Sequence, residues 1–149
     1  IGGLTSFFIY RRRKRRQLKA ELERFATMLP PFSQFSKDMR KATRQLHDIK
    51  TDEQVSGYIK KLDEDFRLYL IRELVVPALQ VSDRQVLREI KREHPNIYHE
   101  YKAELHRVFT ELTKAKNDNA KVKVKDCEDL SFLSRKLAEK IHEMKRKTK

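Results

Sequence analysis

The sequence contains only three glycines, four prolines and one cysteine among its 149 residues. So few glycines leave no glycine-rich loop to cradle a phosphate, and neither a P-loop nor a dinucleotide-binding motif is present. The single cysteine, Cys127, excludes an intramolecular disulfide and fits a reducing compartment. No Cys/His spacing typical of a zinc site occurs. We expect Cys127 to be a small buried hydrophobe on a helix.

A catalytic signature is also missing. Asp63, Glu64 and Asp65 are consecutive, so on a helix they point in different directions and are expected to form its polar face. General acid–base catalysis would instead need carboxylates that converge on a cleft. His99 and His106 share a helical face, but the sequence offers them no third metal ligand. We therefore expect a chain that is not an enzyme and that carries no metal or cofactor.

Charge is abundant but uneven. Charged residues make up 38% of the chain, and the net charge is +13. Residues 1–50 carry 13 Lys and Arg against four Asp and Glu, and residues 101–149 carry 14 against eight. Residues 51–100 are slightly acidic, with eight against ten. Basic ends around a neutral centre fit attraction to an anionic surface at least as well as a dedicated DNA-binding face.

The most informative stretch is "LTSFFIYRRRKRR", residues 4–16. The apolar run at 1–10 is half of the about 20 residues that span a bilayer, and the charge follows it, unlike the order in a signal peptide. The chain does not begin with methionine, so we expect residues 1–16 to be the end of a transmembrane helix with its basic juxtamembrane run. By the positive-inside rule, the basic run would mark the cytoplasmic side. The residues predicted to bind the anionic membrane surface are Arg11, Arg12, Arg13, Lys14, Arg15 and Arg16.

Two other interpretations of this stretch stay open. It could be a nuclear-import or nucleic-acid-binding patch, or simply the solvated start of a helix. Single-stranded nucleic-acid binding would gain support from exposed aromatics among the basic residues. The candidates fall instead on an apolar helical stripe, which favours core packing; they are Tyr98, Tyr101 and Phe109.

The apolar periodicity predicts an all-α fold. A helix from Arg11 to Leu29 is expected to stop at Pro30-Pro31, and a second, basic helix should run from Ser36 to about Lys50. We interpret residues 17–50 as a basic helical spacer. Together with the preceding run, it forms a basic N-terminal helical neck.

Residues 51–149 should form a bundle of about four helices that acts as an interaction domain. Capping boxes at Thr51–Gln54 and Ser82–Gln85 predict two helix starts, and Pro95 suits the first position of a third helix. Asp126 is expected to cap the last helix. The preceding "AKVKVK" alternates and predicts an extended loop or a short edge strand.

The segment "LDEDFRLYLIRELVVPALQVSDRQVLREI", residues 62–90, resembles BatD-like proteins. These are membrane-anchored components of Bat (aerotolerance) clusters, which are associated with MoxR-type ATPases. In such proteins an arginine-rich run after the membrane helix is followed by a basic spacer, which the resemblance matches to residues 11–16 and 17–50. The family's helix core would be Phe66/Tyr69/Leu70 and its capping motif residues 82–85. Its further helix pair would be the helices around 97–112 and 127–145. The resemblance implies a non-enzymatic assembly module tethered at the inner membrane, with von Willebrand A-domain Bat proteins or the ATPase as partners.

We therefore expect a cytoplasmic helical protein-interaction domain of a membrane-anchored bacterial protein. The alternative is a helical nucleic-acid-binding module that uses both basic termini.

Overall fold

The computed structural model describes residues 12–13, 16, 18–20, 22–23, 29–79, 81–117 and 122–147. These residues form helices joined by short connections, with no strand among them, which confirms the predicted all-α fold. The elements are α2 (Pro31–Gln45), the short 3-10 helix η1 (Leu46–Asp48), α3 (Asp52–Leu74), α4 (Asp83–Glu93), α5 (Pro95–Asn117) and α6 (Val124–Lys147).

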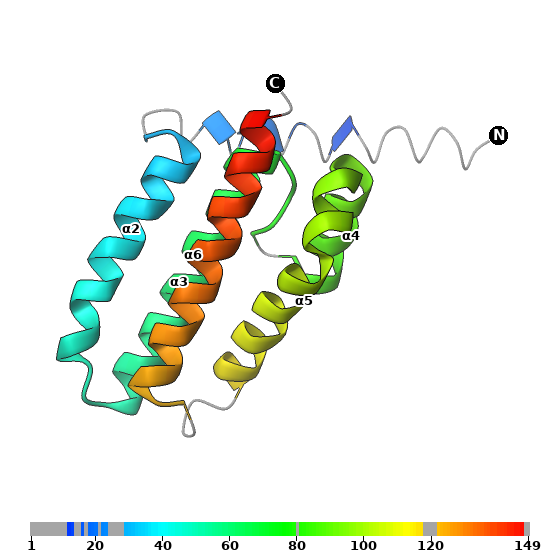
Figure 1. Ribbon diagram of the computed structural model, residues 1–149. Coiled ribbons are helices and arrows are strands. Elements are labelled where there is room, and N and C mark those ends of the chain that lie inside the picture. The colour runs from blue at the N-terminus through cyan, green and yellow to red at the C-terminus, as the bar shows by residue number, and fades with distance from the viewer. Residues whose placement is uncertain are drawn as a thin grey trace.

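Helices α3, α4 and α6 run toward one end of the bundle and α2 and α5 run away from it, so that chain ends and turns collect at the two ends (Figure 1). One end holds the described residues between 12 and 23, the start of α2, the C-terminus of α3, the α4–α5 turn and the C-terminus of α6. We call this the terminal end. The opposite end holds the α2–α3 and α5–α6 connections.

Helix α3 is the central element, and local sequence chemistry sets both of its ends. The Thr51 side chain accepts a hydrogen bond from the Gln54 amide, and the Thr51 amide donates in return to the Gln54 side-chain oxygen, which is the predicted capping box. The helix ends at Leu74, two residues ahead of the Val76-Pro77 break. The other predicted starts are also confirmed, since the Ser82 side chain accepts from the Gln85 amide and α5 begins at Pro95.

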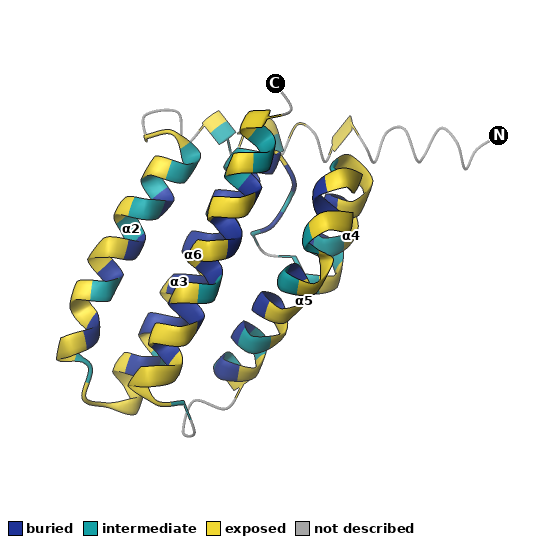
Figure 2. Cartoon of the chain, viewed as in Figure 1, coloured by how far each residue is buried: buried dark blue, intermediate teal, exposed yellow. Residues whose placement is uncertain are grey.

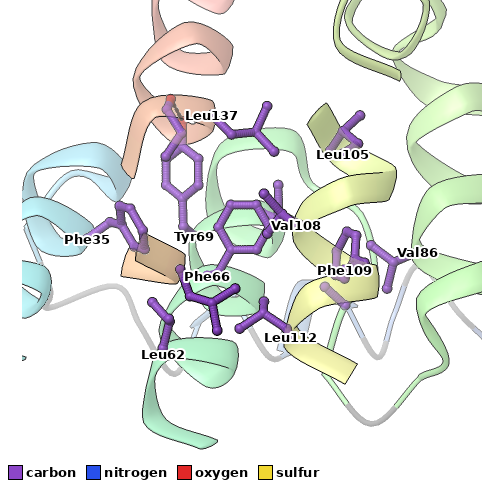
Figure 3. Packing of buried hydrophobic residues seen from close by; sticks show 14 of the residues in the cluster. Phe35, Leu62, Phe66, Tyr69, Val86, Leu105, Val108, Phe109, Leu112 and Leu137 are labelled. Atoms are coloured by element: carbon purple, nitrogen blue, oxygen red, sulfur yellow. Dashed lines mark hydrogen bonds between the residues drawn. The ribbon is translucent and has the colours of Figure 1, made fainter. Parts of the chain in front are cut away.

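The core is organised around Phe66 of α3, which is fully buried. Its ring lies 6.2 Å from that of Phe35 on α2 and 5.7 Å from that of Phe109 on α5 (Figure 3). Burial follows the inward side of each helix, and the outward sides are exposed (Figure 2). Cys127 is fully buried, as predicted.

Helix α2 begins earlier than predicted and belongs to the bundle. It starts at Pro31 and not at Ser36, because proline lacks the N–H that the first helical position does not need. Phe35, Met39 and Ala42 are buried against α3 and α6. The stretch interpreted as a spacer is therefore, from Pro31 onward, part of the same core as residues 51–147.

The start of α6 was also predicted too late. The helix begins at Val124, within "AKVKVK", and not after Asp126. The Asp126 carboxylate lies in the first turn and accepts a hydrogen bond of 2.9 Å from the Lys123 amide. The Asp126 side chain thus bonds to a residue that precedes the helix. Its negative charge also interacts favourably with the positive end of the helix dipole.

Candidate functional site

The predicted anion-binding run is described at three of its six positions. Arg12, Arg13 and Arg16 are helical and exposed. Arg11, Lys14 and Arg15 lie outside the described residues. The three described guanidinium groups are accessible for binding to an anionic surface.

The N-terminal residues lie against the bundle through their apolar side chains. Leu18 and Leu22 are half-buried and pack on the core, whereas Arg16 and Lys19 are exposed. The four-residue spacing of the two leucines places them on one side of a helical turn. This packing leaves the basic residues on the solvent side of the terminal end.

A second basic group meets the first at this end. The last turn of α6 contains Lys145, Arg146 and Lys147, and the side chains of Arg146 and Lys147 are exposed. The C-terminus of α6 and the described N-terminal residues share the terminal end in Figure 1. Among the described residues, the exposed acids nearest in sequence to the two basic groups are Glu23 and Glu143. Folding therefore places described basic residues from both ends of the sequence at the same end of the bundle.

A cluster of aromatic and polar side chains joins α2, α3 and α6 close to the terminal end. The Phe32 ring of α2 stacks on the His142 imidazole of α6 at 4.6 Å and 7°. His142 Nδ1 lies 2.6 Å from Glu73 Oε1 on α3, so one contact chain joins three helices. The Tyr69 hydroxyl donates to the Ala138 carbonyl at 3.0 Å, and burial raises the pKa of Tyr69. These contacts fix the helices that carry the basic groups.

The largest polar cluster of the described core was not predicted. Arg67 is buried, and its Nε lies 3.1 Å and 3.2 Å from the two carboxylate oxygens of Asp63. Its guanidinium also donates to the carbonyls of Ala78 at 2.9 Å and Val81 at 3.1 Å, and to the Asp83 carboxylate. One side chain thus fastens the connection between α3 and α4 onto α3.

Two further side chains complete this cluster from α5. Lys116 Nζ lies 3.1 Å from Asp63 Oδ2, and the Thr113 hydroxyl donates to Asp83. The Arg67 guanidinium also sits over the Phe109 ring, 5.3 Å from its centre. The cluster is satisfied by partners from the chain itself, so we assign it a structural role.

The interpretation of Asp63, Glu64 and Asp65 as a polar face is therefore wrong for two of the three. Only Glu64 is exposed. Asp65 is buried, with Lys61 Nζ 3.0 Å from one carboxylate oxygen and no hydrogen-bond partner on the other. Burial raises the pKa of Asp65. The aspartates are covered because α3 has neighbours on more than one side.

The remaining candidates for metal binding or catalysis, which are histidine, tyrosine and cysteine side chains, do not gather at one site in the described part of the chain. His99 and His106 are exposed, and His106 Nε2 lies 3.2 Å from the Tyr98 hydroxyl. Over the described ranges, no three His, Cys, Asp or Glu side chains are grouped so that they could hold a metal ion. Tyr98 and Phe109 are buried and Tyr101 is half-buried, as the apolar stripe predicted. Burial raises the pKa of the Cys127 thiol to about 11.

Comparison with protein-family models, curated proteins and solved structures found no match to this chain. None of the helices in the part that the structure describes is both long and apolar enough to cross a bilayer. The expected membrane-spanning end at residues 1–10 lies outside the described residues. The membrane anchor and the resemblance to BatD-like proteins therefore stay predictions.

Proposed function

We propose that this chain is the cytoplasmic assembly domain of a membrane-anchored bacterial protein, with its terminal end against the anionic inner-membrane surface. The observation that carries this proposal is the meeting of two basic groups at one end of the bundle. Arg12, Arg13 and Arg16 are exposed there, and Arg146 and Lys147 extend from the same end. A basic residue near an anionic bilayer contributes about 1 kcal/mol to binding, so a few such residues give a salt-sensitive attachment.

The sides of the bundle would then be free to bind partner proteins. The partners implied by the resemblance are von Willebrand A-domain proteins or a MoxR-type ATPase of the same membrane complex. A scaffold role is also favoured by the buried charges, because Arg67 and Asp63 are used to hold the chain together. We assign the domain no catalytic role.

Flotation with phospholipid vesicles tests the membrane proposal. The test variant replaces Arg12, Arg13 and Arg16 with serine, and the matched control replaces Lys114, Lys123 and Lys125, which are exposed near the opposite end. On vesicles of equal parts phosphatidylglycerol and phosphatidylcholine, losing three contacts of about 1 kcal/mol each should weaken partitioning by about a hundredfold. The control should partition like the unmodified chain, and pure phosphatidylcholine should bind neither protein.

Equal loss in both variants would mean that net charge, and not the terminal end, controls binding. Equal partitioning of the test variant and the unmodified chain would overturn the proposal. Nucleic-acid binding is measured in parallel on duplex DNA and RNA. Tight binding there with a steep salt slope, and none to vesicles, would favour the nucleic-acid alternative.

A further inference from the structure

The terminal end also exposes apolar side chains. Four large apolar residues of the described chain are notably exposed, namely Leu29 at 46%, Val75 at 49%, Val124 at 38% and Phe132 at 54%. Leu29 directly precedes the Pro30-Pro31 start of α2, and Val75 directly follows α3, so both belong to the terminal end. The Arg72 guanidinium, one turn before Val75, donates to the Leu29 carbonyl and so links the two segments.

Val75 is held in a backbone conformation that valine disfavours. Its φ of 55° and ψ of 49° place it in the left-handed region, where it ends α3 and donates from its N–H to the Ile71 carbonyl at 2.9 Å. Glycine or asparagine usually occupies this position, because a β-branched side chain there is strained. Since the Val75 side chain is half-exposed, packing within the domain does not account for its presence. Strain of this kind points to a role outside the fold.

We propose that Leu29 and Val75 insert into the boundary between the headgroups and acyl chains of an anionic bilayer. The inference rests on the proposed function and names how that site would bind. Membrane-surface segments combine apolar side chains, which enter the bilayer boundary, with basic side chains, which bind headgroups. The terminal end has this combination, since the exposed Arg12, Arg13 and Arg16 lie at the same end as the two apolar side chains. This charge complementarity favours an anionic lipid surface over a purely apolar partner.

The test compares Leu29→Ser and Val75→Asn with Phe132→Ser, which removes an exposed apolar side chain from the body of α6. Each protein is floated with vesicles of equal parts phosphatidylglycerol and phosphatidylcholine, and its thermal midpoint is measured without lipid. Each of the first two changes should reduce partitioning by up to about tenfold, as expected for one apolar side chain withdrawn from the bilayer. Phe132→Ser should leave partitioning unchanged.

Val75→Asn distinguishes a role in lipid binding from a role in stability, because the two roles predict different changes in melting temperature and in vesicle partitioning. Asparagine tolerates the left-handed conformation, so the variant should melt at the same or a higher temperature than the unmodified chain while binding vesicles more weakly. A lower melting temperature together with unchanged partitioning would show that Val75 serves the fold, and it would overturn the inference.

The remaining outcomes separate this inference from the proposed function. If the arginine variant loses vesicle binding while Leu29→Ser and Val75→Asn do not, the inference fails and the proposed function stands. If none of these variants changes binding, both fail. Sedimentation without lipid completes the test, because self-association that disappears in Leu29→Ser and Val75→Asn would assign the two side chains to a contact between copies and overturn the inference.

Discussion

Replacing Arg67 with methionine should destabilise the domain by about 3–5 kcal/mol, the typical loss when one partner of a buried ion pair is removed. Methionine keeps much of the side-chain volume but removes the charge that faces Asp63 and Asp83. It also leaves the carbonyls of Ala78 and Val81 without their Arg67 donor. Each buried acceptor that loses its donor costs about 1–3 kcal/mol, and these terms overlap with the ion-pair loss.

Two contacts limit the damage. Asp63 keeps its ion pair with Lys116, and Asp83 keeps the hydrogen bond from Thr113. The Asp83 side chain is also 28% exposed, so water can partly solvate its carboxylate. The expected loss is therefore in the range for one broken pair and not the sum of all contacts that Arg67 makes. A domain of ordinary stability, about 5–15 kcal/mol, should remain folded at low temperature.

Urea unfolding followed by far-ultraviolet circular dichroism measures the loss. The midpoint should fall while the slope stays constant, because the same surface is exposed on unfolding. The matched control is Arg84→Met, which changes an exposed arginine next to Asp83 and should alter stability by no more than about 0.5 kcal/mol. A loss below about 1 kcal/mol for Arg67→Met, similar to that of the control, would refute the assignment of Arg67 as the residue that fastens the α3–α4 connection.

Thr51→Ala removes the acceptor for the Gln54 amide and should cost about 1 kcal/mol in urea unfolding, and an unchanged midpoint would contradict the capping role. Asp65→Asn should be more stable than the unmodified chain at neutral pH. Burial raises the folded-state pKa of Asp65 above its unfolded value, so the unmodified chain loses stability as the pH rises through the folded-state pKa. That gain should vanish below the ordinary aspartate pKa of about 3.9, and a gain that is the same at all pH values would exclude ionisation as its cause. Cys127 is fully buried with its pKa raised to about 11, so a thiol reagent at pH 8 should label it rapidly only after unfolding, and fast labelling of the folded chain would contradict its burial.

The helices that the sequence predicted correctly are those with local end signals. Thr51, Ser82 and Pro95 each act within one helical turn of the helix start that they set, so neighbouring residues were sufficient to find them. Pro30-Pro31 was harder to interpret, because proline both ends one helix and suits the first turn of the next. The start of α6 was missed since Asp126 acts from within its first turn.

The buried charges and the terminal end depend on contacts distant in sequence. Asp63 was predicted to lie on a polar face with Glu64 and Asp65, because the apolar stripe of α3 describes only one side of the helix, and no local pattern singled out Arg67. The burial of Asp63 and Arg67 arises when the connection after α3 folds back, placing Ala78 and Val81 against Arg67, and when α5 supplies Lys116. The two basic ends of the sequence meet because of where α6 finishes relative to the described N-terminal residues, which no local pattern encodes.

Depth-dependent fluorescence quenching can determine whether the terminal end contacts the membrane. Cys127 is replaced with alanine, and a single environment-sensitive fluorophore is attached at Val75→Cys in one protein and at Phe132→Cys in another. Each protein is then mixed with anionic vesicles that carry nitroxide groups at the top of the acyl chains. If the terminal end enters the bilayer boundary, the label at position 75 should show strong quenching and a blue-shifted emission, and the label at position 132 should show neither change. Equal quenching at the two positions, or none at position 75 in protein that floats with the vesicles, would contradict membrane contact by the terminal end.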